Sequence, residues 1–173
     1  MLEAGTNELI AGVDEAGRGP WAGPVVVAAA ILSDKSSAAL QRVGVNDSKA
    51  LSKAARERCF EVIRDEESRG TLWLAIASAE VAEIDEHNIL RATLRAMTRA
   101  VTALPVAPTR ALIDGNQLPK LLCPGETVVR GDSKILSIAA ASIAAKVTRD
   151  RLMAALARDH PGYGWERNAG YGT

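Results

Sequence analysis

The sequence predicts one α/β domain in which a mixed β-sheet is flanked by α-helices. Its 173 residues suit a single domain better than two. Hydrophobic residues make up 47% of the chain and charged residues 24%, which is enough apolar material for an ordinary buried core. Short apolar runs alternate with longer stretches of helical periodicity, in the order β-β-α-β-α-β-β-α. Because no repeat or linker interrupts this order, we expect residues 1–173 to form one unit.

The first two predicted strands form a hairpin. Residues 9–13 are mostly apolar and are expected to form a short strand that ends at Asp14. A nearly continuous apolar run at residues 25–32 has the length of a buried strand. The glycines and proline of residues 17–20 lie between the two runs and mark the turn.

Helices and strands alternate in the rest of the chain. Ser52 is suited to cap a helix that runs to about Asp65, because its hydroxyl can accept a hydrogen bond from the first turn. A long helical pattern extends from Val81 to Leu104 and is ended by Pro105. The remaining predicted elements are strands at residues 71–78, 111–113 and 127–130 and a helix at residues 135–159.

Composition excludes several classes of protein. No apolar run reaches the roughly 20 residues that a bilayer-spanning helix needs, and residues 1–8 lack the features of a secretion signal. Cys59 and Cys123 lie far apart with no zinc-binding pattern, which predicts reduced thiols and a cytoplasmic location. Lys plus Arg and Asp plus Glu number 21 each, so net charge alone does not indicate a polyanionic partner.

Acidic residues follow three of the predicted strands. They are Asp14 with Glu15, Asp114 and Asp132, and each group has glycine close by. Side chains that leave neighbouring strands at one sheet edge can converge, and converging carboxylates raise one another's pKa unless a cation lies among them. Oxygen ligands without His or Cys favour Mg²⁺ or Mn²⁺. Acidic residues in solvated turns are the alternative, and the pattern alone leaves both interpretations open.

Such a carboxylate cluster suits phosphodiester hydrolysis. Two divalent ions roughly 4 Å apart can activate a water and stabilise the leaving oxygen. Three further segments could contact phosphate: the Gly17-Arg18-Gly19 loop, Lys49 before the first long helix, and a helix face with Ser142, Lys146 and Arg149. Each has a structural alternative, namely a plain hairpin turn, a helix cap or a solvated helix face.

A set of short motifs keeps one order along nearly the whole chain. The motifs are AGVDEAGRGP at residues 11–20, AGPV at 22–25, NDSK at 46–49, EID at 83–85 with NI at 88–89, LIDGN at 112–116, GDS at 131–133, AASIAAKVTRD at 140–150 and GYGT at 170–173. Together they resemble the type 2 ribonuclease H family (ribonuclease HII). Type 3 enzymes typically carry Gly-Thr-Gly in the first loop and an added N-terminal domain, so Arg18 and the short chain favour type 2.

The resemblance implies a ribonuclease H-like fold and cleavage of RNA in RNA–DNA hybrids, including single ribonucleotides embedded in DNA. It implies that the metal-binding catalytic acids are Asp14, Glu15, Asp114 and Asp132. The backbone of the loop at residues 17–19 would contact the 2′-OH of the ribonucleotide, the group that distinguishes RNA from DNA. Tyr171 would stack on the sugar of the following deoxynucleotide.

These inferences predict an Mg²⁺- or Mn²⁺-dependent endonuclease that cuts on the 5′ side of a ribonucleotide and leaves 3′-OH and 5′-phosphate ends. We expect a monomer and no membrane partner. A junction resolvase on a similar sheet and a non-catalytic nucleic-acid-binding module are the rival interpretations. Family members normally continue for a few turns beyond GYGT, whereas this sequence stops at Thr173, so either it is a truncated form or the natural protein is short.

Overall fold

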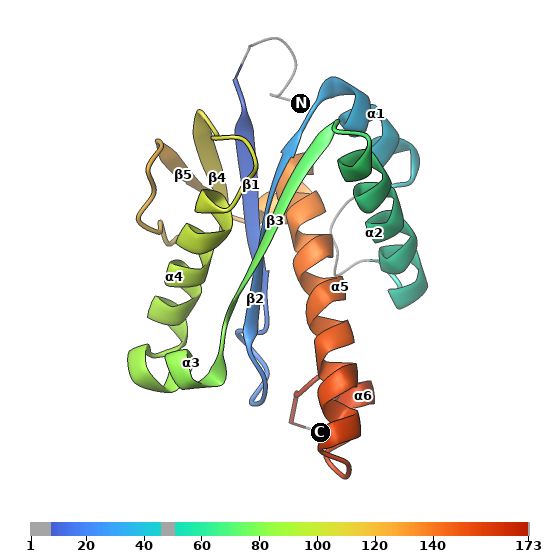
Figure 1. The fold of residues 1–173 in the computed structure, drawn as a ribbon, viewed down its shortest axis with the longest axis vertical. Helices are drawn as coiled ribbons and strands as arrows, with labels where there is room; N and C mark the ends of the chain where they lie inside the picture. Colours follow the sequence, from blue (N-terminus) through green and yellow to red (C-terminus); the bar gives the residue numbers. More distant parts are fainter. Residues whose placement is uncertain (1–7, 46–50, 173) are drawn as a thin grey trace.

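A five-stranded mixed sheet forms the centre of the molecule (Figure 1). The computed structural model describes residues 8–45 and 51–172. The strand order is β3-β2-β1-β4-β5; β1, β2 and β3 are antiparallel neighbours, whereas β4 and β5 run parallel to β1. The strands are β1 (Ile10–Ala16), β2 (Val25–Leu32), β3 (Leu72–Ala79), β4 (Arg110–Asp114) and β5 (Gly125–Val128). The predicted mixed α/β fold is therefore confirmed.

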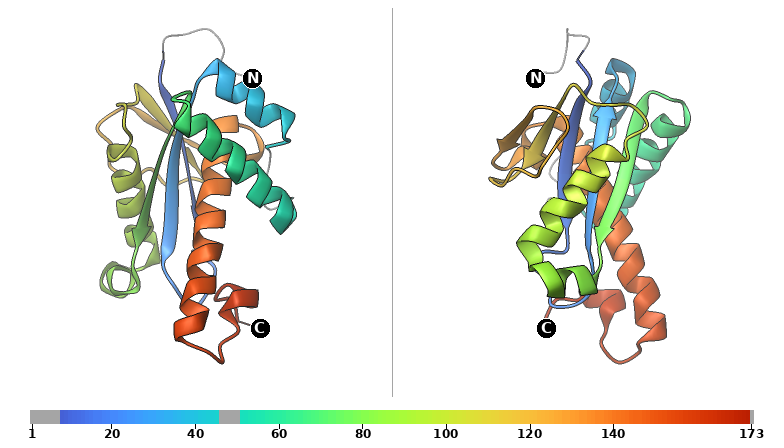
Figure 2. Two further views of the ribbon diagram at one scale, coloured as in Figure 1. Left: turned by 45° about the vertical axis from the view of Figure 1, so that its right-hand side comes forward. Right: turned by 60° about the vertical axis from the view of Figure 1, so that its left-hand side comes forward.

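Helices cover both faces of this sheet, as the two views of Figure 2 show. On one face α4 packs its buried Ala92, Ala96 and Met97 against β1 and β2, and on the other α2 and α5 enclose a second apolar cluster. Burial of these two apolar faces is the main force that holds the layers together. The helices are α1 (Asp34–Arg42), α2 (Lys53–Ser68), α3 (Val81–His87), α4 (Ile89–Thr102), α5 (Leu136–Asp159) and α6 (Trp165–Asn168), with one 3₁₀ turn, η1 (Gly131–Ser133).

The helix α5 approaches β1 unusually closely. A Cβ added to Gly12 of β1 would lie 2.3 Å from the backbone of Ser137 and Ile138 in α5. Glycine is therefore required at this position, and the alanines of α5 extend the same close contact along the helix. This approach brings the polar face of α5 to the end of β1 where Asp14 lies.

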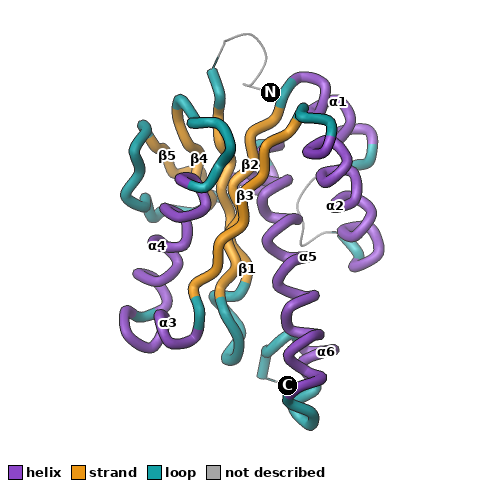
Figure 3. The backbone as a smooth tube through the Cα atoms, viewed as in Figure 1, coloured by secondary structure: helices purple, strands orange, loops and turns teal. Residues whose placement is uncertain are grey.

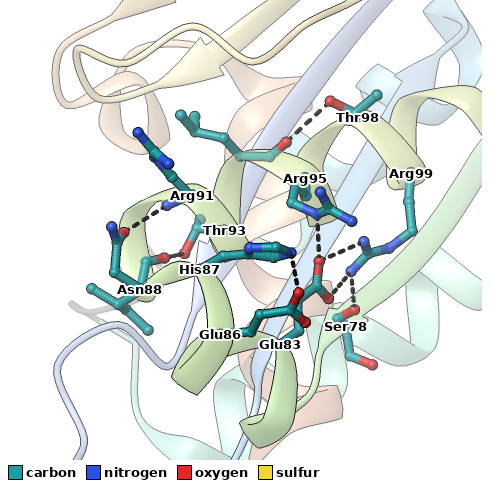
Figure 4. A network of polar contacts seen from close by, with 12 residues as sticks. Ser78, Glu83, Glu86, His87, Asn88, Arg91, Thr93, Arg95, Thr98 and Arg99 are labelled. Atoms are coloured by element: carbon teal, nitrogen blue, oxygen red, sulfur yellow. Dashed lines mark hydrogen bonds and ion pairs between the residues drawn. The ribbon is translucent and has the colours of Figure 1, made fainter.

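The predicted helix over residues 81–104 is wrong in one respect, because it is two helices. Asn88 separates them with a φ of 69°, a left-handed conformation that asparagine tolerates, and its side chain accepts a hydrogen bond from the N–H of Arg91. Glu83 of α3 bonds Arg95 and Arg99 of α4 and holds the two helices together (Figure 4). Apolar periodicity continues across the break, which is why the pattern resembled one helix.

Two strand boundaries and one helix also differ from the prediction. The first strand does not end at Asp14, since pairing with β2 continues through Ala16. The strand predicted at residues 127–130 is β5, at Gly125–Val128, because Arg130 adopts a left-handed conformation that starts η1. The helix α1 was not predicted; its cap is formed by Ser33 and Ser36, which bond each other's backbone in a segment with few apolar residues.

Other predictions are confirmed at or near their boundaries. The strand β2 has the predicted bounds, and the Ser52 hydroxyl caps α2 by accepting from the N–H of Ala55. Both cysteines are free thiols, Cys59 buried and Cys123 partly buried. Within the described residues, no helix combines the length and apolar character that crossing a membrane requires.

Candidate active site

Asp14 and Asp114 lie side by side at one edge of the sheet. The strands β1 and β4 are parallel, and their register pairs Val13 with Ile113, the residues immediately before the two acids. The carboxyl ends of parallel strands meet at one edge, which is where ligands of α/β sheets bind. Glu15 follows Asp14 within β1 and forms an ion pair with Arg18 at 3.3 Å. The register thus places Asp14 close to Asp114, as the sequence predicted for these two acids.

Asp132 reaches the same region through the backbone. The carboxylate of Asp114 accepts hydrogen bonds from the N–H of Gly131 at 2.7 Å and from the N–H of Asp132 at 3.4 Å. Asp132 therefore lies in η1, directly beside Asp114, and only 5% of it is exposed. The packing around position 131 is tight, because an added Cβ would lie 2.6 Å from the terminal side-chain carbon of Ile138, which would have to shift.

A cavity of about 230 Å³ opens in front of the acids. It is enclosed by the end of β1, the loop that follows it, and residues from α2, α5 and the C-terminal segment. Most of the residues proposed from the sequence meet here, although Asp132 does not line it. The lining residues are Asp14, Glu15, Ala16, Gly17, Arg18, Gly19, Arg56, Asp114, Ser142, Lys146, Arg149 and Tyr171.

The electrostatic environment of Asp14 is unfavourable for a carboxylate. Burial raises the pKa of Asp14 well above its ordinary value, and the negative charges of Glu15 and Asp114 raise it further. Hydrogen bonds from the Ser142 side chain and from the N–H of Glu15 act in the opposite direction but do not reverse the shift. The protein thus concentrates negative charge at this edge of the sheet without an equal positive charge against Asp14.

The donor set suits a hard divalent cation. Every candidate ligand is a carboxylate oxygen, and Mg²⁺ characteristically uses one or two carboxylates and fills its other positions with water and substrate phosphate. In the parts of the chain that the structure describes, no three acidic, His or Cys side chains lie close enough to hold an ion by themselves. The arrangement therefore fits an ion shared between the protein, water and a phosphate group rather than an all-protein cage.

The candidates on α5 have three different environments. The side chain of Ser142 is buried and bonds Asp14, and Lys146 pairs with Asp150 at 2.7 Å at the cavity wall. Arg149 differs from the predicted phosphate contact, because it is 1% exposed and its guanidinium donates to three backbone carbonyls. Lys49 lies outside the described residues.

Arg56 is a lining residue that the sequence did not single out. It lies in the first turn of α2, far from the acid-bearing strands in the chain, and only the packing of α2 against α5 brings it to the cavity. No local signal distinguishes it from the other basic residues of α2, since Lys53, Arg58 and Arg64 occupy the same helix.

The Gly17–Gly19 loop and Tyr171 lie next to each other at the wall of the cavity. A Cβ on Gly19 would lie 3.5 Å from a ring carbon of Tyr171, and half of Tyr171 is exposed. Gly17 has a φ of 110°, which a residue with a side chain rarely adopts. Figure 3 shows the loop after β1 and the segment after α6 at the same end of the molecule.

Comparison with known proteins identifies the family of the chain. The family model described as Ribonuclease HII matches residues 11–173. The chain belongs to the ribonuclease HII family. The ribonuclease HII of Ruegeria pomeroyi is 55% identical over 173 residues, covering 99% of this chain and 70% of its own length. On this basis the protein is an endonuclease of the ribonuclease H class.

Solved structures agree with the fold. The ribonuclease H2 of Pyrococcus horikoshii OT3 superposes with a TM-score of 0.79 at 30% identity, covering 95% of this chain and 81% of its own. The Bst-RNase HIII structure in complex with Mn²⁺ superposes with a TM-score of 0.76 at 24% identity, covering 88% of this chain and 55% of its own. The predicted ribonuclease H-like fold and the family are thereby confirmed.

Proposed function

We propose that the chain is a divalent-metal-dependent endonuclease that cuts the RNA strand of RNA–DNA hybrids and the 5′ side of single ribonucleotides embedded in duplex DNA. The products carry 3′-OH and 5′-phosphate ends. The observation that carries this proposal is the position of Asp14 and Asp114, each one residue beyond the paired Val13 and Ile113 of adjacent parallel strands, together with the raised pKa of Asp14. Acids held in this way favour a bound cation over a proton once Mg²⁺ or Mn²⁺ is available.

In this proposal Asp14, Glu15, Asp114 and Asp132 hold the metal. Two ions held by these acids would supply an activated water and would stabilise the leaving oxygen. The chain's own groups keep the acids in place: the hydrogen bond from the Ser142 side chain orients Asp14, and the N–H groups of η1 orient Asp114. Lys146 lies at the cavity wall, where its ammonium can attract a phosphate of the substrate.

Recognition of the ribonucleotide is assigned to the Gly17-Arg18-Gly19 backbone and Tyr171. Glycines allow the loop backbone to approach a 2′-OH without a Cβ between them. The exposed ring of Tyr171 offers an apolar face to the sugar of the next nucleotide. The short distance between Gly19 and Tyr171 supports contact with adjoining nucleotides.

The wider role follows from this chemistry. Residues 1–173 are proposed to be the catalytic domain of a monomeric cytoplasmic enzyme that removes ribonucleotides from DNA and degrades primers and hybrids. The free thiols of Cys59 and Cys123 support a reducing compartment. Hybrid nucleic acid and ribonucleotide-containing DNA are the proposed partners.

A duplex DNA with one ribonucleotide tests the proposal. Purified protein is incubated with this duplex and with the same duplex lacking the ribonucleotide. Each incubation is done with divalent metal and, as a control, with chelator and no divalent metal. We expect one nick, immediately 5′ of the ribonucleotide, only with Mg²⁺ or Mn²⁺ and only in the first duplex.

Two other outcomes would contradict it. Cleavage of a branched all-DNA substrate with indifference to the ribonucleotide would favour a junction resolvase. Metal-independent hybrid binding that falls steeply with salt, without any cut product, would favour a non-catalytic binding module.

A further inference from the structure

Arg149 is the one buried basic side chain in the described residues, and its environment is unusual. It lies in α5, is 1% exposed, and has no carboxylate among its hydrogen-bond acceptors. Its three guanidinium nitrogens donate to backbone carbonyls instead: Nε to Pro24 at 2.9 Å, Nη2 to Ala22 at 2.8 Å and Nη1 to Ala169 at 2.8 Å. Burying a charge is costly, so the burial of this guanidinium against three carbonyls needs an explanation. We look for it in the segments to which the carbonyls belong.

The three carbonyls come from two segments that are far apart in the chain. Ala22 and Pro24 belong to the loop between β1 and β2. Ala169 follows α6 and precedes Tyr171 by two positions in the chain. The same two segments also bond each other directly, because the carbonyl of Gly170 accepts from the N–H groups of Trp21 and Ala22. Arg149 thus joins both segments to α5 through hydrogen bonds.

Glycines on both segments make room for this arrangement. A Cβ on Gly17 would lie 2.3 Å from Nε of Arg149, and a Cβ on Gly170 would lie 2.5 Å from the carbonyl oxygen of Ala22. Both clashes involve the groups of the bridge itself, and both glycines have positive φ. The loop and the C-terminal segment therefore pack against the guanidinium with no space for a larger residue.

We propose that Arg149 is a positioning residue that fixes the distance between the Gly17–Gly19 loop and Tyr171, and so sets the preference for an isolated ribonucleotide followed by DNA. The inference rests on the proposed function, because it assigns the 2′-OH to the loop and the next sugar to Tyr171. A junction substrate must satisfy both groups at once, whereas a uniform hybrid offers a 2′-OH at every position and depends less on their spacing. Arginine is required because its planar fork reaches three carbonyls, whereas lysine has a single nitrogen.

The test compares Arg149→Lys with a matched control, Arg158→Met, which changes an exposed arginine in the last turn of the same helix. We measure kcat and KM separately on a single-ribonucleotide duplex and on a uniform RNA–DNA hybrid. For Arg149→Lys we expect kcat/KM on the single-ribonucleotide duplex to fall by about a hundredfold, the scale of a misplacement of about 1 Å. The uniform hybrid should lose markedly less, and Arg158→Met should leave both values unchanged.

Chemical rescue guards against a simple folding defect. For Arg149→Ala, low millimolar guanidinium ion should restore part of the single-ribonucleotide activity, because the free ion can bond the same three carbonyls. An equal concentration of a salt of another monovalent cation, one that cannot donate hydrogen bonds, should not restore activity. An equal loss on both substrates for Arg149→Lys, together with no rescue of Arg149→Ala, would overturn the proposal.

Hydrogen–deuterium exchange tests the bridge without any substrate. In Arg149→Lys, peptides covering residues 17–24 and residues 165–172 should both exchange faster, whereas peptides from α4 should not change. Faster exchange in only one of the two segments would show that they are not coupled through Arg149. If the wild-type protein fails to cut the ribonucleotide duplex, the proposed function fails, while the exchange result still decides whether the bridge exists.

Discussion

Two acidic clusters in this protein are built in opposite ways. In the first, Glu83 accepts hydrogen bonds from Arg95 and from both terminal nitrogens of Arg99, at 2.7–2.9 Å, and the Arg99 bond lowers the pKa of Glu83 from its ordinary value (Figure 4). In the second, burial and the neighbouring carboxylates raise the pKa of Asp14. The contrast separates an acid whose charge two arginines neutralise from one that is buried beside further negative charge.

This difference has a physical meaning for function. An acid that is paired with two arginines is structurally satisfied, and it serves to join α3 to α4. A buried acid next to other acids costs stability in the free protein, and such costs are concentrated at functional sites. Substitutions of Asp14 and of Glu83 should therefore have different effects on cleavage and on stability.

The largest expected effect is on catalysis. Asp14→Asn keeps the size of the side chain but removes a charge that we propose binds metal, so cleavage should fall by a factor on the order of a thousand, as when a group that stabilises transition-state charge is removed. Glu83→Gln should leave cleavage within about twofold of wild type, since Glu83 is not among the residues that line the cavity. Steady-state cleavage of the single-ribonucleotide duplex measures both. Near-normal activity in Asp14→Asn would refute the role given to that residue.

The second effect is on stability without metal. A folded-state pKa above the unfolded value means that protonated Asp14 contributes stability at low pH, and that this stability is lost as the pH rises through the raised pKa. Asp14→Asn cannot ionise, so its melting temperature in chelator should exceed that of wild type at neutral pH and converge with it in acid.

Divalent cation should reverse that order. Mg²⁺ or Mn²⁺ at about a hundred times its Kd should add about 2.7 kcal/mol to the unfolding free energy of the wild-type protein and less to Asp14→Asn. Thermal melts of both proteins, with and without metal, measure the two differences. An Asp14→Asn protein that is less stable than wild type in chelator would contradict the unfavourable environment assigned to Asp14.

The smallest effect concerns the Glu83 cluster. Glu83→Gln should cost about 1 kcal/mol at neutral pH, the scale of a pair of partly exposed ion pairs. Because the folded pKa of Glu83 is lowered, this stability is present above its unfolded pKa and is lost as the pH falls through the folded value. Urea unfolding across this pH range measures the difference, and it should shrink at high salt.

Glu86→Gln is a suitable control for that measurement. Glu86 lies on the same helix, its side chain is largely exposed, and its carboxylate lies 3.8 Å from Nε2 of His87. Its substitution should change the unfolding free energy by less than that of Glu83. Equal effects of the two substitutions would show that the bonds from Arg95 and Arg99 contribute nothing measurable.

Local patterns were sufficient for much of the fold. Buried strands such as β2 have continuous apolar runs, and helix starts such as that of α2 have a capping serine, so both were predictable from neighbouring residues. The break at Asn88 was not, because a left-handed residue can leave the apolar period of the flanking helices intact. The helix α1 was missed for a related reason, since its cap is made by serines in a polar segment.

By itself, the sequence determined which residues to propose for the chemistry: acids at the ends of apolar runs, within motifs of a known family, are recognisable because residue type and strand pattern are local properties. Only the tertiary structure decided how these residues are supported. The register of β1 and β4 brings Asp14 beside Asp114, the packing of α2 brings Arg56 to the cavity, and the burial of Arg149 turns an expected phosphate contact into a bond with three carbonyls. These contacts join residues up to 127 positions apart, and burial and hydrogen-bond partners at that separation exist only once the chain has folded.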